Sequence, residues 1–120
     1  MTNRGYLIDE NVTPAIADQL LRRRPDMDVA VVGGEAAPTK GTGDPDILMW
    51  IEAHGFMLVT RNRKSMPEHL RRHLLDERHI PGILTLRPKA SLGEIIDDLL
   101  LVWELSEPDE YRDQIIHVPF

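Results

Sequence analysis

Short apolar runs alternate along the chain with stretches in which apolar residues recur every three or four positions. Runs of the first kind predict buried β-strands, and stretches of the second kind predict amphipathic helices. Five strands are predicted, at residues 6–9, 29–32, 56–60, 83–86 and 115–118. Apolar strands separated by helices are typical of a mostly parallel sheet that is covered on both faces. The predicted fold class is therefore α/β, a single-domain three-layer α/β/α sandwich.

Two of the predicted helices begin at a cap residue that is followed by proline. Thr13 precedes Pro14, and this pair predicts a helix over residues 14–24. Asp44 and Pro45 repeat the signature after a loop rich in glycine, proline and threonine. Both helices are predicted to start where the proline occupies the first helical position.

The other two helices begin at the spacing of a capping box, in which a serine and an acid three residues later bond each other's backbone N–H. Ser65 and Glu68 have this spacing, and the helix that they open is predicted to reach about residue 78. Ser91 and Glu94 have it too. The helix after Ser91 carries the longest apolar stripe of the chain.

Length and composition limit the classes of protein that need to be considered. The 120 residues predict one domain, residues 1–120. No cysteine is present, which excludes a disulfide framework and a thiolate metal site. No apolar run reaches the roughly 18 residues of a transmembrane helix, so no membrane contact is expected. The segment before the first strand is too short and polar for a signal peptide, and a cytoplasmic location is expected.

Charge is distributed unevenly along the chain. The net charge of −6 argues weakly against tight nonspecific binding of nucleic acid. Residues 61–79, however, hold six Lys or Arg against three acids, whereas residues 91–120 hold eight acids against one Arg. The basic middle segment is predicted to contact phosphates, and the alternative is that these charges belong to solvated helix surfaces.

Acidic side chains follow the first predicted strand and open the second predicted helix. Asp9 and Glu10 come directly after an apolar run, with Asn11 as a supporting residue, and Asp44 and Asp46 lie at the helix start. The carboxyl ends of parallel strands share one edge of a sheet, where open α/β folds bind ligands. Carboxylates gathered there repel each other unless a cation lies between them. The four acids are therefore predicted ligands of a divalent metal, Mg²⁺ or Mn²⁺.

Polar and cationic side chains follow the third predicted strand. Thr60 closes that strand, and Asn62 comes two residues later among three cations, Arg61, Arg63 and Lys64. The cations are predicted to hold the phosphates of a substrate. Thr60 is predicted to support the site through a hydrogen bond to the acid that closes the first strand or to a neighbouring loop.

The same residues also have structural interpretations. Asp44 before a proline is a candidate helix N-cap, Asp46 in a first helical turn is favoured by the helix dipole, and Glu10 is expected to face solvent if Asp9 faces inward. His69 and His73 have the helical spacing of metal ligands. No carboxylate lies between them in zinc-protease fashion, so a surface pair is the favoured interpretation.

Four short motifs, in this order along the chain, resemble the PIN-like domains of the DUF5615 family. They are Leu-Ile-Asp-Glu-Asn at residues 7–11, Asp-Pro-Asp-Ile-Leu at 44–48, Met-Leu-Val-Thr-Arg at 57–61 and Pro-Gly-Ile-Leu at 81–84. The family is related to VapC-type toxin nucleases and to Mut7-C domains, and the resemblance covers about residues 5–88. It implies a three-layer α/β/α fold and Mg²⁺- or Mn²⁺-dependent cleavage of RNA, often within a toxin–antitoxin pair.

Carried onto this chain, the resemblance implies catalytic roles for Asp9, Asp44 and the Asn62 position, with Glu10 and Asp46 as accessories. The family usually shows two acids after the Thr-Arg of its third motif. Here those two positions hold Asn62 and Lys64, and metal affinity should fall because it follows the charge of the ligands. Two hypotheses result: a metal-dependent endoribonuclease, or a catalytically degenerate PIN-like module that binds a protein partner or nucleic acid.

Other functional hypotheses concern partners and a different enzyme class. Trp103, Tyr111 and Phe120 in the acidic C-terminal segment suggest a homodimer or an antitoxin-like protein partner, with core packing as the favoured role of Trp103. A phosphoryl-receiving signalling domain would also carry paired acids after its first strand. It would need an aspartate at the end of the third strand, where this chain has Thr60.

Overall fold

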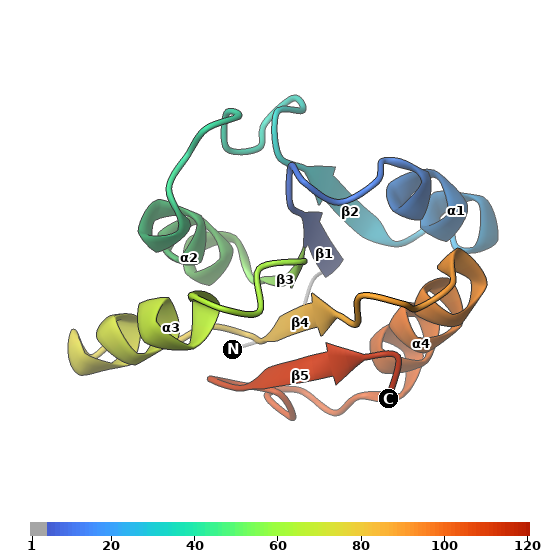
Figure 1. The fold of residues 1–120 in the computed structure, drawn as a ribbon. Helices are drawn as coiled ribbons and strands as arrows, with labels where there is room; N and C mark the ends of the chain where they lie inside the picture. Colours follow the sequence, from blue (N-terminus) through green and yellow to red (C-terminus); the bar gives the residue numbers. More distant parts are fainter. Residues whose placement is uncertain (1–4) are drawn as a thin grey trace.

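The computed structural model describes residues 5–120, and its helices and strands alternate along the chain (Figure 1). The strands and helices are, in order, β1 (Gly5–Ile8), α1 (Ala15–Arg23), β2 (Asp28–Val31), α2 (Asp44–His54), β3 (Phe56–Thr60), α3 (Met66–Leu75), β4 (Ile83–Leu86), α4 (Leu92–Leu105) and β5 (Ile115–Val118). The five strands form one sheet in the order β2-β1-β3-β4-β5, and every neighbouring pair is parallel. The predicted α/β fold is confirmed.

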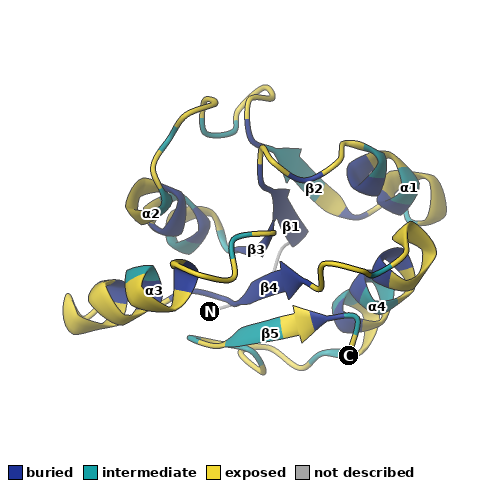
Figure 2. Cartoon of the chain, viewed as in Figure 1, coloured by how far each residue is buried: buried dark blue, intermediate teal, exposed yellow. Residues whose placement is uncertain are grey.

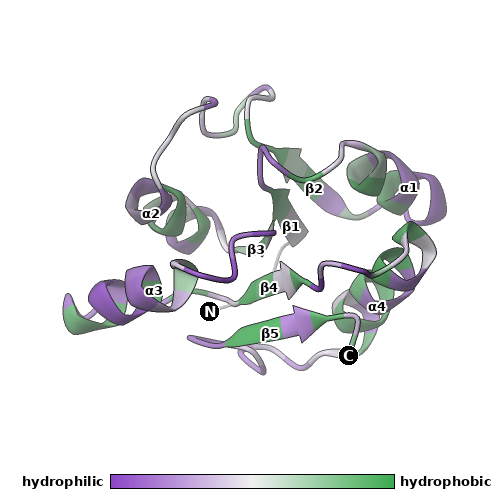
Figure 3. Ribbon diagram, in the orientation of Figure 1, coloured by the Kyte–Doolittle hydropathy of each residue, from purple (hydrophilic) through white to green (hydrophobic). Residues whose placement is uncertain are grey.

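Helices cover both faces of the sheet, as the sandwich prediction requires (Figure 1). Successive side chains on a strand point to opposite faces. Tyr6 and Ile8 of β1 therefore pack in one buried cluster with α1 and α4, whereas Leu7 packs in a second cluster with α2 and α3. Figures 2 and 3 show the same division, since each helix turns a buried, hydrophobic side toward the sheet.

The strand bounds follow the apolar runs closely. β3, β4 and β5 have the predicted bounds, and β5 lies at the edge of the sheet. The prediction was wrong by one residue for β1 and β2, which each begin and end one position earlier. Asp9 therefore follows β1 instead of closing it, although its backbone N–H still donates to the carbonyl of Val59 at 2.9 Å.

Only one of the predicted helix starts has the predicted cap. Ser91 and Glu94 form the capping box, with the Glu94 N–H donating to Ser91 Oγ at 3.2 Å and the Ser91 N–H donating to Glu94 Oε1 at 3.2 Å. The capping box at Ser65 is wrong, because this side chain makes no cap hydrogen bond and bonds Asn62 instead. α3 also ends at Leu75, earlier than predicted.

The two cap-plus-proline predictions were also wrong in detail. α1 runs over Ala15–Arg23 with Pro14 at the N-cap position, while Thr13 Oγ1 accepts a hydrogen bond of 3.3 Å from the Ala15 N–H. α2 begins at Asp44 with Gly43 at its N-cap position. Asp44 is therefore not a cap, and its carboxylate is free to point toward the loop after β3.

None of the helices described in residues 5–120 is long and apolar enough to cross a membrane.

Candidate functional site

Asp9 is a buried carboxylate at the carboxyl edge of the sheet, with 7% of its surface exposed. β1 pairs with β3, so Asp9 lies beside the end of β3. Its Oδ2 accepts a hydrogen bond of 2.7 Å from the Thr60 hydroxyl, and its Oδ1 accepts one of 2.8 Å from the Glu10 N–H. The predicted bond between Thr60 and Asp9 is confirmed. These two donors offset the cost of burying the charge.

Thr60 connects Asp9 to the loop that follows β3. Its side chain is fully buried, and its hydroxyl donates to Asp9 while it accepts a hydrogen bond of 3.1 Å from the Asn62 N–H. A hydroxyl that both donates and accepts leaves little freedom for the groups on either side. Thr60 therefore fixes the position of Asn62 relative to the buried carboxylate.

The side chain of Asn62 links the start of α2 to the start of α3 through hydrogen bonds. Its amide nitrogen donates to Asp44 Oδ2 at 2.7 Å and to Ser65 Oγ at 2.8 Å. Its amide oxygen accepts from the Ser65 N–H at 3.2 Å. Asp9, Thr60, Asn62, Asp44 and Ser65 form one continuous chain of hydrogen bonds, which we call the edge network.

His69 extends the edge network toward α3. Its Nε2 lies 3.6 Å from Asp44 Oδ2, and its Nδ1 is buried with no hydrogen-bond partner in the described part of the chain. His73 is buried and its Nε2 lies 2.7 Å from Glu52 Oε1. The two histidines therefore have different partners, and the interpretation as a surface pair was wrong.

Glu52 holds the far ends of α2 and α3 together, away from the edge network. Its carboxylate lies 3.2 Å from the Arg78 guanidinium and accepts a hydrogen bond of 3.0 Å from the His79 N–H, in addition to its contact with His73. Burial raises the pKa of the Glu52 carboxyl, but the hydrogen bonds from His79 and His73 outweigh that effect. The net result is a pKa below the ordinary value.

Two of the four predicted acidic ligands lie apart from the edge network. Glu10 is exposed, and its Oε1 accepts a hydrogen bond of 2.9 Å from the Gly41 N–H, so it anchors the glycine-rich loop. Asp46 is exposed and lines a separate cavity of about 310 Å³ together with His69 and Arg72. Asn11 is exposed as well.

The carboxylates that the structure brings into one network are therefore Asp9 and Asp44, joined through Thr60 and Asn62. Within residues 5–120, no group of three or more His, Asp or Glu side chains is arranged to hold a metal ion. Mg²⁺ accepts one or two carboxylates with water and phosphate oxygens as its other ligands. Asp9 and Asp44 fit that minimal donor set, because each carboxylate oxygen keeps a lone pair beyond its hydrogen bond.

Exposed cations lie beside this network, in the loop after β3, which is strongly hydrophilic in Figure 3. Arg61, Arg63 and Lys64 are exposed, and none of them forms an ion pair with another residue of the described range 5–120. They are therefore available to an anionic ligand, and their role in phosphate binding stays a prediction.

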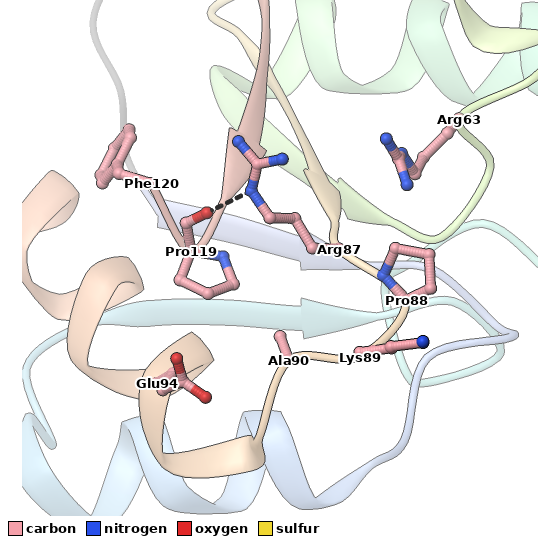
Figure 4. A pocket seen from close by; sticks show the side chains of 8 residues that line it. All are labelled: Arg63, Arg87, Pro88, Lys89, Ala90, Glu94, Pro119 and Phe120. Atoms are coloured by element: carbon pink, nitrogen blue, oxygen red, sulfur yellow. Dashed lines mark hydrogen bonds between the residues drawn. The ribbon is translucent and has the colours of Figure 1, made fainter.

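The structure adds two cations that the sequence analysis missed. Arg87 and Lys89 follow β4, and together with Arg63 they line a cavity of about 560 Å³ (Figure 4). The signal was present in the sequence, because β4 is parallel to β3 and its carboxyl end therefore lies at the same edge. The prediction considered the segments after the first and third strands and the start of the second helix, and not the segment after the fourth strand.

The three aromatic residues of the C-terminal segment have different surroundings. Trp103 and Tyr111 are half-buried against the cluster under α1 and α4, and the Arg24 guanidinium lies 4.5 Å from the centre of the Trp103 ring. Core packing is therefore confirmed for Trp103. Phe120 is 68% exposed, which leaves it as the aromatic ring of this segment that a ligand or partner can cover.

Comparisons of the chain with family models, with curated proteins and with solved structures give no match. The resemblance to PIN-like domains remains a prediction that rests on four short motifs. The edge network and the cations beside it are the observations from which a function is proposed.

Proposed function

We propose that the protein is a catalytically degenerate PIN-like module that binds RNA at the carboxyl edge of its sheet and does not cut it. The observation that carries this proposal is the hydrogen bond of 2.7 Å from the Asn62 amide to Asp44. A metal ion bound to Asp44 would need an oxygen of residue 62 as its ligand, at the place where the amide nitrogen of Asn62 lies. The amide presents N–H to the carboxylate, so Asn62 takes the part that a cation would otherwise play and holds Asp44 without metal.

Binding of RNA is supported by the cations around the edge network. Arg61, Arg63 and Lys64 follow β3, and Arg87 and Lys89 follow the next strand. Phosphate contacts with Lys and Arg supply most of the sequence-independent affinity for nucleic acid. Five cations therefore lie at one edge of the sheet, which also carries Asp9, Glu10, Asp44 and Asp46, in a chain whose net charge is −6.

A metal-dependent endoribonuclease of PIN-like type is the second candidate, and the burial of Asp9 beside a partly buried Asp44 favours it. Asp9 and Asp44 would hold Mg²⁺ or Mn²⁺, which would supply Lewis-acid chemistry to a phosphodiester. Lys64 would then provide a fixed positive charge for the phosphate. The two candidates share the RNA surface and differ in what the pair of carboxylates does.

The RNA surface is tested by fluorescence anisotropy with a labelled RNA of mixed sequence in the presence of EDTA. The double variant Arg61→Gln/Lys64→Gln is compared with Arg22→Gln, which removes an exposed arginine of α1 outside this edge. We expect the double variant alone to bind weakly. Its plot of log K against log salt should be shallower by about 1.4, because each lost phosphate contact on a single strand contributes about 0.7. Equal binding by wild type and double variant would refute the proposal.

Cleavage is tested with the same RNA and millimolar Mg²⁺ or Mn²⁺. We expect wild type and Asp9→Asn to leave the RNA equally intact. Cleavage by wild type that Asp9→Asn abolishes would exclude the degenerate module and establish the nuclease. Asp9→Asn preserves the size of the side chain. Thermal unfolding of this variant shows whether a loss of cleavage results from a loss of stability.

A further inference from the structure

A cavity of about 560 Å³ lies outside the edge network, at the carboxyl ends of β3, β4 and β5. Figure 4 shows the three segments that meet there. Arg63 comes from the loop after β3, Arg87 and Lys89 come from the loop after β4, and Phe120 follows β5. Because one cavity is lined from three segments, a ligand in it is positioned by the fold and not by a single loop.

Most of the charged residues that line the cavity are cationic. Arg63, Arg87 and Lys89 supply three positive charges, and Glu94 supplies one negative charge. The carboxylate of Glu94 is already engaged in the capping box of α4, where it accepts hydrogen bonds from the Ser91 hydroxyl at 2.8 Å and the Ser91 N–H at 3.2 Å. Hydrogen bonds from these neutral donors leave Glu94 charged, so it offsets one of the three positive charges, and the two that remain make the cavity favour an anion.

The guanidinium of Arg87 is held in a defined orientation. Its Nε donates a hydrogen bond of 2.6 Å to the carbonyl of Pro119 (Figure 4). Its two terminal nitrogens form no hydrogen bond with another residue of the described range 5–120, and a planar fork of this kind matches the oxygens of a phosphate. Lys89 adds a second, more mobile positive charge on the same loop.

Phe120 gives the cavity an apolar wall next to these cations. Phe120 is 68% exposed, so a ligand that covers its ring gains free energy from the burial of apolar surface. Aromatic rings at nucleic-acid sites stack with bases, whatever the base. A volume of about 560 Å³ also lies within the range of small-molecule sites.

We propose that this cavity binds one nucleotide unit, with its phosphate on Arg63, Arg87 and Lys89 and its base against Phe120. The inference deepens the proposed function, because an RNA that lies along the edge would enter the cavity with a terminal nucleotide. The inference rests on the proposed function only if the nucleotide is the end of an RNA. A free nucleoside monophosphate presents the same phosphate and base.

Isothermal titration calorimetry with AMP and UMP tests the cavity directly, with inorganic phosphate and adenosine as partial ligands. Lys89→Gln is compared with Lys40→Gln, another exposed lysine outside the cavity, and Phe120→Ala is compared with Leu105→Ala, another exposed apolar residue. We expect Lys89→Gln and Phe120→Ala to weaken the nucleotides by about tenfold, which corresponds to one charge-assisted hydrogen bond or one stacked base. Phe120→Ala should leave the weaker binding of phosphate unchanged.

Two outcomes would overturn the inference: no binding of the nucleotides at millimolar concentration, or equal binding by wild type, Lys89→Gln and Phe120→Ala. RNA with and without a terminal phosphate identifies the source. If the phosphorylated RNA binds more tightly and the gain is lost in Lys89→Gln, the ligand is an RNA end. If Lys89→Gln weakens only the mononucleotides, the ligand is a free nucleotide.

Failure of the inference and failure of the proposed function give different results. RNA binding that depends on Arg61 and Lys64, without any binding of nucleotides, would refute the cavity site alone. Nucleotide binding that depends on Lys89, without any binding of RNA, would refute the proposed function alone.

Discussion

The amide nitrogen of Asn62 lies 2.7 Å from Oδ2 of Asp44 and links the loop after β3 to the first turn of α2. This contact joins two segments that are 18 positions apart in the sequence. An aspartate at position 62 would place a second carboxylate against Asp44, whereas the amide of Asn62 donates a hydrogen bond to it. We therefore expect the stability of this edge to depend on an amide at position 62.

Asn62→Asp should destabilise the protein by about 1–3 kcal/mol in the absence of metal, because Asp44 loses its donor and faces a like charge. Millimolar Mg²⁺ or Mn²⁺ should restore part of the lost stability of Asn62→Asp. The same metal should stabilise the double variant Asn62→Asp/Lys64→Asp by a larger amount. Urea unfolding with and without metal measures both effects.

Gln19→Glu is the control for the charge alone, since it makes the same amide-to-acid change on α1. Its stability should not depend on the metal. Equal stability of Asn62→Asp and wild type in EDTA would show that the bond between Asn62 and Asp44 contributes nothing.

Thr60→Val should cost about 1–3 kcal/mol, because the buried carboxylate of Asp9 loses the hydrogen bond from the Thr60 hydroxyl. Thr85→Val is the matched variant, since Thr85 pairs with Thr60 in the sheet and is also fully buried. The Thr85 hydroxyl forms a hydrogen bond with His117. His117 is exposed, so solvent can replace Thr85 as its hydrogen-bond partner. Urea unfolding should therefore show a smaller loss for Thr85→Val, and a reversed order would contradict the assignment of Thr60 to Asp9.

Ser91→Ala should lower the free energy of unfolding by about 1 kcal/mol, the usual contribution of a side-chain N-cap. Ser65→Ala should act differently, because Ser65 bonds Asn62 and does not cap α3. We expect Ser65→Ala to shift the amide resonances of Asn62 and Asp44 in NMR spectra. Shifts confined to the first turn of α3 would show instead that Ser65 is a cap.

Glu52→Gln should make the stability of the protein less dependent on pH in acid. The pKa of the Glu52 carboxyl lies below its ordinary value of 4.5 in the folded state. Its contribution is therefore complete above pH 4.5 and is lost as the pH falls through the lower folded-state pKa. Wild type should lose more stability than Glu52→Gln in that window, as measured by thermal unfolding between pH 6 and about pH 3. Glu35→Gln, an exposed loop residue, should follow wild type.

The sheet could be predicted from the sequence because its strands are apolar on both faces. The runs that form β3, β4 and β5 end at polar or turn residues, so their bounds were correct. A parallel order of the strands predicts that Asp9 lies beside Thr60, and the hydrogen bond between their side chains is present. Topology alone fixes which strand ends are neighbours.

The partners of the polar side chains could not be predicted in the same way. Ser65 and Ser91 precede an acid at the same spacing, yet only Ser91 caps a helix. The difference is the nearby Asn62, which competes for the Ser65 side chain. Asp44, at a helix start, could likewise be a helix cap or a ligand of the site. Its role depends on Asn62, which the fold brings to it from the loop after β3.

The position of β1 between β2 and β3 has a consequence for how the chain folds. Among the described strands β1 is synthesised first, but its partner β3 extends to residue 60. Half of the chain must therefore exist before β1 is paired on both sides, and a contact of such long range slows folding. Until then the apolar strand has an unpaired edge that other chains can bind. In a nascent chain halted before residue 56 the open edge is that of β1, whereas in one that has passed residue 60 the open edge is that of β3, until β4 is complete at residue 86.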